Sequence, residues 1–266
     1  MDLFIASTTF AFVAYAIATF AILSRLLSPL GPNIKLVIGF GCLAIIAHSF
    51  SLSQQLFSAA QINFNLPNVI ALVSLVITST VTLVALKFKI NLLLPVTYGF
   101  AALWQLLLVF IPPVNQIVLS ANSFIMVTHI TLALVAYCIL VIATLYAFQV
   151  KYINSKLKGK DLSAVNHLPP LMQVENQLFI ILTLGTISLF ASETIGLIFL
   201  DNFFAKAQLH KTVLSLVALF IYVITLWGHY QQGWRGHRVL TLTTTATAIL
   251  TLAYFGSRFV KEFLIA

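Results

Sequence analysis

The chain has 266 residues, of which 61% are hydrophobic and 8% are charged, and its mean hydropathy is +1.05. A soluble domain carries roughly 25% charged residues, so this composition excludes a water-soluble globular protein and indicates a polytopic membrane protein. The formal net charge of +8 is explained by basic loops that face anionic lipid, so no nucleic-acid partner is expected.

Stretches of about 20 apolar residues predict transmembrane helices along the whole chain. Period-2 alternation is absent and the apolar runs are too long for barrel strands, so helices are the structure that satisfies the backbone in lipid. We therefore expect an all-α, polytopic membrane helix bundle that forms a single domain over residues 1–266. The eight predicted spans are Leu3–Ser24, Lys35–Phe57, Leu66–Leu86, Asn91–Ile111, Ser123–Gln149, Asn176–Leu200, Leu209–His229 and Val239–Phe263.

The distribution of basic residues predicts the orientation of these spans. Ten of the fourteen Lys and Arg residues follow odd-numbered spans: Arg25, Lys35, Lys87, Lys89, Lys151, Lys156, Lys158, Lys160, Arg235 and Arg238. By the positive-inside rule these connections face the cytoplasm and both termini lie outside. The first span lacks a basic n-region and is longer than a signal-peptide core, so we expect it to be retained as a helix.

The connections between spans are too short for a separate catalytic domain. The longest polar segment, Lys151–Glu175, is about 25 residues, far below the 50 or more that a domain needs. The outer connections Ser58–Asn65, Pro112–Asn122 and Asp201–Gln208 are long enough only to cap a cavity. Cys42 and Cys138 are isolated, without a C-x-x-C pair, which argues against a thiol-disulfide carrier and favours a packing role for both.

Three of the six histidines, His48, His129 and His210, are predicted on the outer side, whereas His167, His229 and His237 fall in cytoplasmic loops. His129 lies about six residues into its span, ~9 Å below the outer boundary. Imidazole in hydrocarbon is costly without a partner. One interpretation is a local hydrogen bond, for example to Ser49 or Thr128; the other is ligation of haem iron or of a metal ion.

Glu193 is the only acid predicted within a helix, in the outer part of the sixth span. A carboxylate at that depth is expensive, so we expect it to be protonated, close to the interface, or paired with Lys211 or the histidines. With the histidines it would make a site for a divalent cation. Intramembrane proton relays also use such pairs.

The connection Trp227–Arg238 is rich in Gly, Trp and Arg, which is typical of a tight turn anchored at the headgroups. Together with other segments, this turn carries a resemblance to a known family. These segments are His129–Tyr137, Pro169–Glu175, His210–Ser215, Gly233–Arg238 and Leu252–Val260. In that order they resemble the YpjD-type branch of the cytochrome c assembly family, which includes CcsA- and HemX-like proteins of the bacterial inner (cytoplasmic) membrane.

The resemblance implies that the chain handles haem. Family members of the CcsA type present haem on the outer side for attachment to apocytochrome c, with outer histidines flanking a tryptophan-rich loop. By position, His129 matches the histidine before that loop, His210 lies near the start of the helix after it, and His48 resembles a membrane-embedded histidine of an earlier helix. In this chain the loop is only Asp201–Gln208, which contains no tryptophan, so we do not expect the attachment enzyme activity.

Two main functions therefore remain open from the sequence, beside a purely structural role as a partner in a larger complex. The first is a membrane protein that binds or handles haem b through His129, His48 and His210, alone or with other cytochrome c maturation proteins. The second is a divalent-cation transporter, or an accessory subunit of one, with a site built from Glu193 and the histidines.

Overall fold

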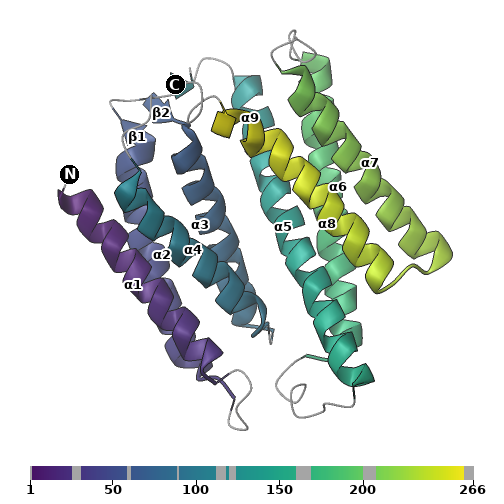
Figure 1. Cartoon of the computed structure of the whole chain (residues 1–266). Coiled ribbons are helices and arrows are strands. Elements are labelled where there is room, and N and C mark those ends of the chain that lie inside the picture. The colour runs from purple at the N-terminus through teal and green to yellow at the C-terminus, as the bar shows by residue number, and fades with distance from the viewer. Residues whose placement is uncertain are drawn as a thin grey trace. The chain divides into compact units, whose positions relative to one another are not determined.

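Long apolar helices make up nearly all of the protein in the computed structural model, which describes residues 2–25, 31–58, 61–88, 90–111, 118–119, 124–159, 169–199 and 208–260 (Figure 1). Eight helices in this part of the chain are long and apolar enough to cross a membrane. This confirms the predicted all-α membrane fold with eight spans; the direction in which they cross stays a prediction. The helices are α1 Asp2–Leu23, α2 Ile34–Leu56, α3 Leu66–Ala85, α4 Leu93–Phe110, α5 Phe124–Lys158, α6 Leu171–Phe199, α7 Leu209–Gln232, α8 His237–Thr251 and the short α9 Ser257–Phe259, with a π-helix, η1, at Leu252–Gly256.

The helices fall into two compact units, each of which is described by itself. Unit 1 comprises residues 1–120 and 156–169, and unit 2 comprises residues 121–155 and 170–266. Unit 1 contains α1 to α4, and unit 2 contains most of α5 together with α6 to α9. The expectation of one domain over residues 1–266 concerns the relation between these units and stays a prediction.

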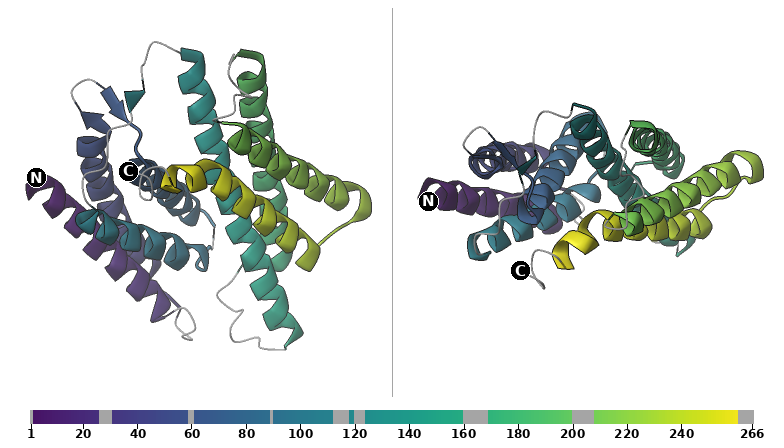
Figure 2. Two further views of the ribbon diagram at one scale, coloured as in Figure 1. Left: turned by 45° about the horizontal axis from the view of Figure 1, so that its top comes forward. Right: turned by 90° about the horizontal axis from the view of Figure 1, so that it is seen from above.

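In unit 1, α1 packs against α2 and α4, and α3 packs against the same two helices (Figure 2). Large apolar side chains point outward, as lipid allows: Phe20 and Phe110 are each 74% exposed. The buried positions of α1 are instead small, for example Ala11 and Ala18, which lets helix backbones approach closely.

Close approach is required where α2 meets α4. A Cβ atom on Gly41 would overlap the ring and hydroxyl of Tyr98, whereas a Cβ on Gly39, two residues earlier and on an exposed face, would touch nothing within 4 Å. The Tyr98 hydroxyl lies 2.7 Å from Oγ1 of Thr82 in α3. Gly41 thus makes room for a polar bridge between α4 and α3.

A small antiparallel sheet lies beyond the ends of the unit 1 helices, where short loops were expected. It consists of β1 Phe57–Ser58, β2 Gln61–Asn63 and β3 Val118–Leu119, in the order β1-β2-β3. Asn65 caps α3 by accepting a hydrogen bond from the Asn68 backbone N–H (3.0 Å), and the Asn68 amide donates to the Asn63 carbonyl (3.0 Å). The cap therefore also fixes the connection that leads out of β2.

In unit 2, α7 and α8 run antiparallel and are joined by a short turn, with α6 beside α7 (Figure 1). The turn begins at Gly233 in the left-handed conformation (φ +67°), where the backbone N–H groups of Gly233 and Trp234 donate to the carbonyls of His229 and Gly228. Glycine suits this position because a side chain would strain it.

Three helix boundaries of unit 2 differ from the prediction. Helix α5 continues to Lys158 instead of Gln149, and α6 begins at Leu171 instead of Asn176. At 1.5 Å per residue the 35 residues of α5 span about 52 Å, more than the ~30 Å hydrocarbon core, so α5 extends beyond it. The last predicted span is divided, because η1 interrupts it after Thr251.

Candidate functional site

His48 lies in the interior of unit 1 and is fully buried. Its Nδ1 is 3.3 Å from the Tyr15 hydroxyl of α1, and the two rings meet edge to face with centroids 5.9 Å apart. The Tyr15 hydroxyl is also 3.3 Å from Oγ1 of Thr78 in α3. The local partner considered from the sequence, Ser49, donates instead to the Ile45 carbonyl, so the partners of His48 come from other helices.

The direction of this hydrogen-bond chain depends on the tautomer of His48. The Thr78 hydroxyl has a carbonyl acceptor, that of Ser74 at 2.8 Å. With the His48 proton at Nδ1, the Tyr15 oxygen accepts from His48, the Tyr15 O–H donates to Thr78, and Nε2 carries the lone pair. With the proton at Nε2, the Tyr15 O–H donates to Nδ1.

Nε2 of His48 is buried and makes no well-formed hydrogen bond in the described part of the chain, and the backbone of Ala71 is an acceptor beside the ring. Buried polar atoms are nearly always satisfied, so each exception requires an explanation. A ring held through Nδ1 with Nε2 unsatisfied has the donor arrangement of a histidine that ligates a metal or haem iron.

His129 lies in α5 of unit 2 and is held from α6. Its Nδ1 is 2.8 Å from the Ser192 carbonyl, and the Ser192 hydroxyl donates back to the His129 carbonyl (3.1 Å). Because a carbonyl only accepts, Nδ1 carries a proton. A histidine that donates Nδ1–H to a backbone carbonyl is the common form of a metal-ligating imidazole.

Glu193 follows Ser192 in α6 and is 7% exposed. Its hydrogen-bond partner is Ser215 of α7, and its Oε2 atom has no partner among the described residues. The hydroxyl of Tyr254 in η1 lies within the electrostatic reach of Glu193. Ser215 is not among the partners suggested by the sequence, and pairing of Glu193 with Lys211 or a histidine stays a prediction.

His210 stands in the first turn of α7 and is exposed. Within the described ranges no group of three or more His, Cys, Asp or Glu side chains comes together to hold a metal ion. His129, Glu193 and His210 of unit 2 therefore do not form the divalent-cation cluster that the alternative required. His48 belongs to unit 1 and His129 to unit 2. The expectation that they converge therefore stays a prediction.

The turn between α7 and α8 forms a second constellation that the sequence analysis described only as an interface anchor. Nε of Arg235 lies 3.4 Å from Oε1 of Glu175, whose side chain is 12% exposed. His229 stacks on Phe179 of α6 (centroids 3.2 Å apart) and its Nδ1 lies 3.0 Å from the Trp234 carbonyl. The expectation that Glu193 is the only acid inside a helix is wrong, because α6 begins early enough to include Glu175.

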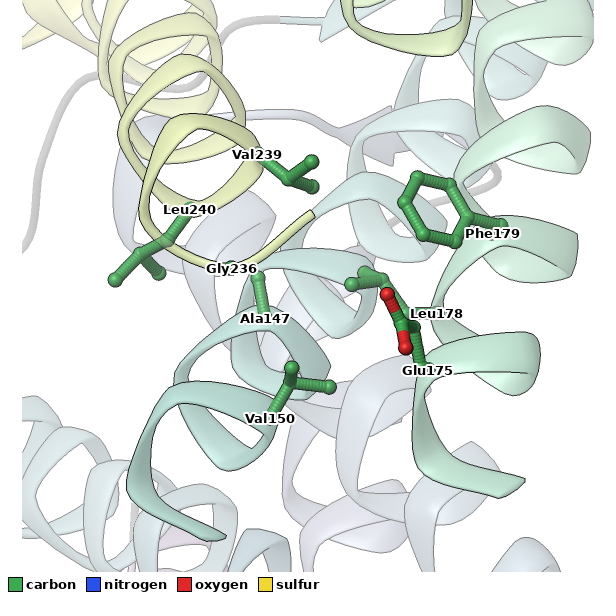
Figure 3. A pocket seen from close by; sticks show the side chains of 8 residues that line it. All are labelled: Ala147, Val150, Glu175, Leu178, Phe179, Gly236, Val239 and Leu240. Carbon is green, nitrogen blue, oxygen red and sulfur yellow. The ribbon is translucent and has the colours of Figure 1, made fainter. Parts of the chain in front are cut away.

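A shallow pocket lies beside this ion pair (Figure 3). The Glu175 carboxyl group is its only charged group, among side chains of α5, α6 and α8. Its lining residues are Ala147, Val150, Glu175, Leu178, Phe179, Gly236, Val239 and Leu240, and the space between them is too narrow for a water molecule. The ion pair therefore fastens the turn to α6 but encloses no ligand cavity.

The outer connection that lacks the tryptophans of the fuller family members, Asp201–Gln208, lies outside the described residues except for Gln208, and His167 also lies outside them.

Comparisons with known proteins agree with the helical architecture. The sequence model of one family, described as Cytochrome C assembly protein, matches residues 36–265. Three relatives named Inner membrane protein YpjD, from Escherichia coli K12, O6:H1 and O157:H7, are each 38% identical over 254 residues, which cover 95% of this chain and 96% of the relative. No solved structure matches the chain.

Proposed function

Because the chain belongs to the cytochrome c assembly protein family, and membership supports a function related to cytochrome c biogenesis, we propose that it binds haem b in the membrane through His129 and His48. The chain is a multi-pass protein of the inner membrane, as its relatives are named. Its role is to hold or hand on haem without catalysing the attachment of haem to apocytochrome c, since Asp201–Gln208 contains no tryptophan-rich platform.

The observation that carries the proposal is the state of the two imidazoles. Each has Nδ1 within hydrogen-bond distance of a group on a neighbouring helix, Tyr15 for His48 and Ser192 for His129, and ligation of iron through Nε2 uses the tautomer with the proton at Nδ1. Haem iron takes an imidazole nitrogen as axial ligand, and a hydrogen bond at the other ring nitrogen orients the ring and raises its basicity. For His48 the fit is closest, since its buried Nε2 has no partner in the described chain.

We propose that His210 contacts haem at the outer side and contributes less to haem binding than His129 and His48. Its ring is exposed at the start of α7, where water competes for both nitrogens. The divalent-cation alternative is not favoured by any described contact, because Glu193 is bonded to Ser215 and lies in no cluster of metal-binding side chains.

The proposal is tested by the absorbance spectrum of detergent-purified protein from haem-supplemented cells, oxidised and reduced. We expect a Soret band that is lost or strongly reduced in His129→Ala and His48→Ala and less reduced in His210→Ala. The control is His237→Ala, which should leave the band unchanged. His237 is exposed and is the first residue of α8, near the end of α7 that is opposite His210. A colourless wild-type protein, or full Soret bands in both His129→Ala and His48→Ala, would refute the proposal.

Loss of colour through misfolding is distinguished by chemical rescue. In His129→Gly, added imidazole occupies the space of the missing ring and is expected to restore the band. The same addition to wild-type protein is the control for binding of imidazole elsewhere.

A further inference from the structure

Three polar side chains in the core of unit 1 are each fully buried (0% exposed): Thr8 of α1, His48 of α2 and Gln105 of α4. The Thr8 hydroxyl, Nε2 of His48 and both polar atoms of the Gln105 amide make no well-formed hydrogen bond with the described residues. Buried polar atoms are nearly always satisfied. Exceptions on three helices of one unit therefore require an explanation, above all an amide that lacks a partner at both of its ends.

A contact between α2 and α4 sets the level of two of these side chains. Tyr98 of α4 lies directly against Gly41 of α2. Gln105 follows Tyr98 by seven residues, and His48 follows Gly41 by the same number. Seven residues are nearly two turns, or about 10 Å along a helix axis. If α2 and α4 run in the same direction, Gln105 and His48 therefore lie at the same level and on the faces that meet at Gly41.

Contacts on the far side of this level show that the two helices do run in the same direction. Trp104, which precedes Gln105, packs against a cluster that includes Leu52 of α2 and Ala71 of α3. Leu52 follows His48 by one turn. Gln105 and His48 are thus enclosed between the same two sets of contacts.

Thr8 reaches this level from α1, which packs against both α2 and α4. The Tyr15 hydroxyl lies 3.3 Å from Nδ1 of His48, and the Tyr15 ring is 5.6 Å from that of Tyr98. Thr8 precedes Tyr15 by seven residues on the same fully buried face. Because α1 runs antiparallel to α2 (Figure 1), Thr8 is displaced from Tyr15 toward the same end of the unit as His48 is from Gly41.

The chemistry of these groups indicates a small neutral ligand. A hydroxyl, an imidazole and an amide together donate and accept hydrogen bonds. The only acid in α1 to α4 is Asp2, the first residue of α1, so an ion at this level would have no counter-charge, and burial of an isolated charge is far more costly than burial of a neutral group. Water donates and accepts, and buried waters typically make about three hydrogen bonds to otherwise unsatisfied groups.

We propose that Thr8, His48 and Gln105 form a binding site for one buried water molecule in the core of unit 1. The Gln105 amide N–H donates to the water, and the water bridges to the Thr8 hydroxyl and to Nε2 of His48. Because water both donates and accepts, it serves either tautomer of the imidazole. The site does not rest on the proposed function, but iron at Nε2 would displace the water from His48, so the site is tested in protein that shows no Soret band.

The presence of water is tested by X-ray radiolysis followed by mass spectrometry. Hydroxyl radicals that form from a bound water oxidise the side chains beside it, so we expect oxidation of His48 despite its full burial. Gln105→Leu should abolish this oxidation. The internal control is Leu94 of α4, which is equally buried and should stay unmodified in both proteins. Oxidation of His48 no greater than that of Leu94, relative to the reactivity of each side chain, overturns the proposal.

Thermal unfolding in detergent tests whether Thr8 and Gln105 share the water. Loss of one partner leaves the other unsatisfied, so Gln105→Leu and Thr8→Val should each lower the Tm, and the double variant should lower it by clearly less than the sum. The control is Thr19→Val, whose hydroxyl bonds the Tyr15 carbonyl within α1 and whose effect should add to that of Gln105→Leu. A Tm raised by Gln105→Leu, as expected for removal of an amide without a partner, or additive losses with Thr8→Val, would refute the shared site.

Discussion

The Tyr15 hydroxyl of α1 lies 3.3 Å from Nδ1 of the fully buried His48 in α2. The same hydroxyl lies 3.3 Å from Oγ1 of Thr78 in α3, whose own proton goes to the Ser74 carbonyl. Three helices of unit 1 thus take part in orienting a single imidazole.

Tyr15→Phe should therefore weaken haem binding without removing the ligand. The variant keeps the ring but loses the hydroxyl that contacts Nδ1, and loss of such an outer hydrogen bond typically lowers affinity about 10–100-fold. The measurement is a haem titration of the apoprotein by absorbance. Tyr98→Phe is the matched control, because the Tyr98 hydroxyl bonds Thr82 and not His48; equal weakening in both variants would contradict the assignment.

Ser192→Ala separates the hydroxyl of Ser192 from its carbonyl. The carbonyl accepts from His129 Nδ1 and remains in the variant, so the Soret band should persist. The hydroxyl donates to the His129 carbonyl, and its loss should lower stability by about 1 kcal/mol, seen as a lower Tm. The control is Ser188→Ala, which removes an exposed hydroxyl one turn earlier in α6. It should change neither the Soret band nor the Tm. A lost Soret band in Ser192→Ala would mean that the hydroxyl orients the ring.

The membrane spans were predictable because the thickness of the bilayer sets the length of an apolar run. The same criterion failed at Lys158 and Leu171, where helices continue through polar residues. A helix ends where its backbone hydrogen bonds stop, and hydropathy does not report where that happens. The π-helix at Leu252–Gly256 has no apolar signature for the same reason.

The partners of the histidines were not predictable. Tyr15 and Ser192 lie 33 and 63 residues from the histidines they contact, and contacts over such separations depend on how each helix is rotated about its axis. When a helix has apolar side chains on all sides, its hydropathy says little about how it is rotated about its axis. The Glu175–Arg235 pair did leave a signal, since two of the segments that carry the family resemblance, Pro169–Glu175 and Gly233–Arg238, contain opposite charges on the same predicted side of the membrane.

Gly41→Ala should destabilise unit 1. The added methyl group overlaps Tyr98, and overpacking of this kind costs about 1–3 kcal/mol, so the Tm in detergent should fall. Gly39→Ala meets nothing within 4 Å and gains helix propensity, so its Tm should stay equal or rise. A Gly41→Ala protein as stable as Gly39→Ala would show that Tyr98 moves aside freely.

The orientation can be tested with alkaline phosphatase, which is active only outside the cytoplasm. We expect an active fusion after Ala266 and an inactive fusion after Lys158, because ten of the fourteen basic residues lie in or beside connections on the Lys158 side and basic connections stay in the cytoplasm. Fusions of both kinds must be present at similar levels on a blot. The reverse pattern of activity would invert the predicted topology, and with it the assignment of His48 and His129 to the outer half.

The Glu175–Arg235 pair should respond asymmetrically to the loss of either partner. Arg235 is 59% exposed and remains hydrated in Glu175→Gln, whereas the Glu175 side chain is 12% exposed and loses its cation in Arg235→Gln. We expect a cost of about 0–1 kcal/mol for Glu175→Gln and about 1–3 kcal/mol for Arg235→Gln, since a largely buried acceptor is left unsatisfied. Unfolding of unit 2 can be followed by a thiol-reactive dye at the buried Cys138 in a Cys42→Ala background. The double variant should recover most of the loss in Arg235→Gln; equal costs for both single variants would mean that the pair behaves as an ordinary surface contact.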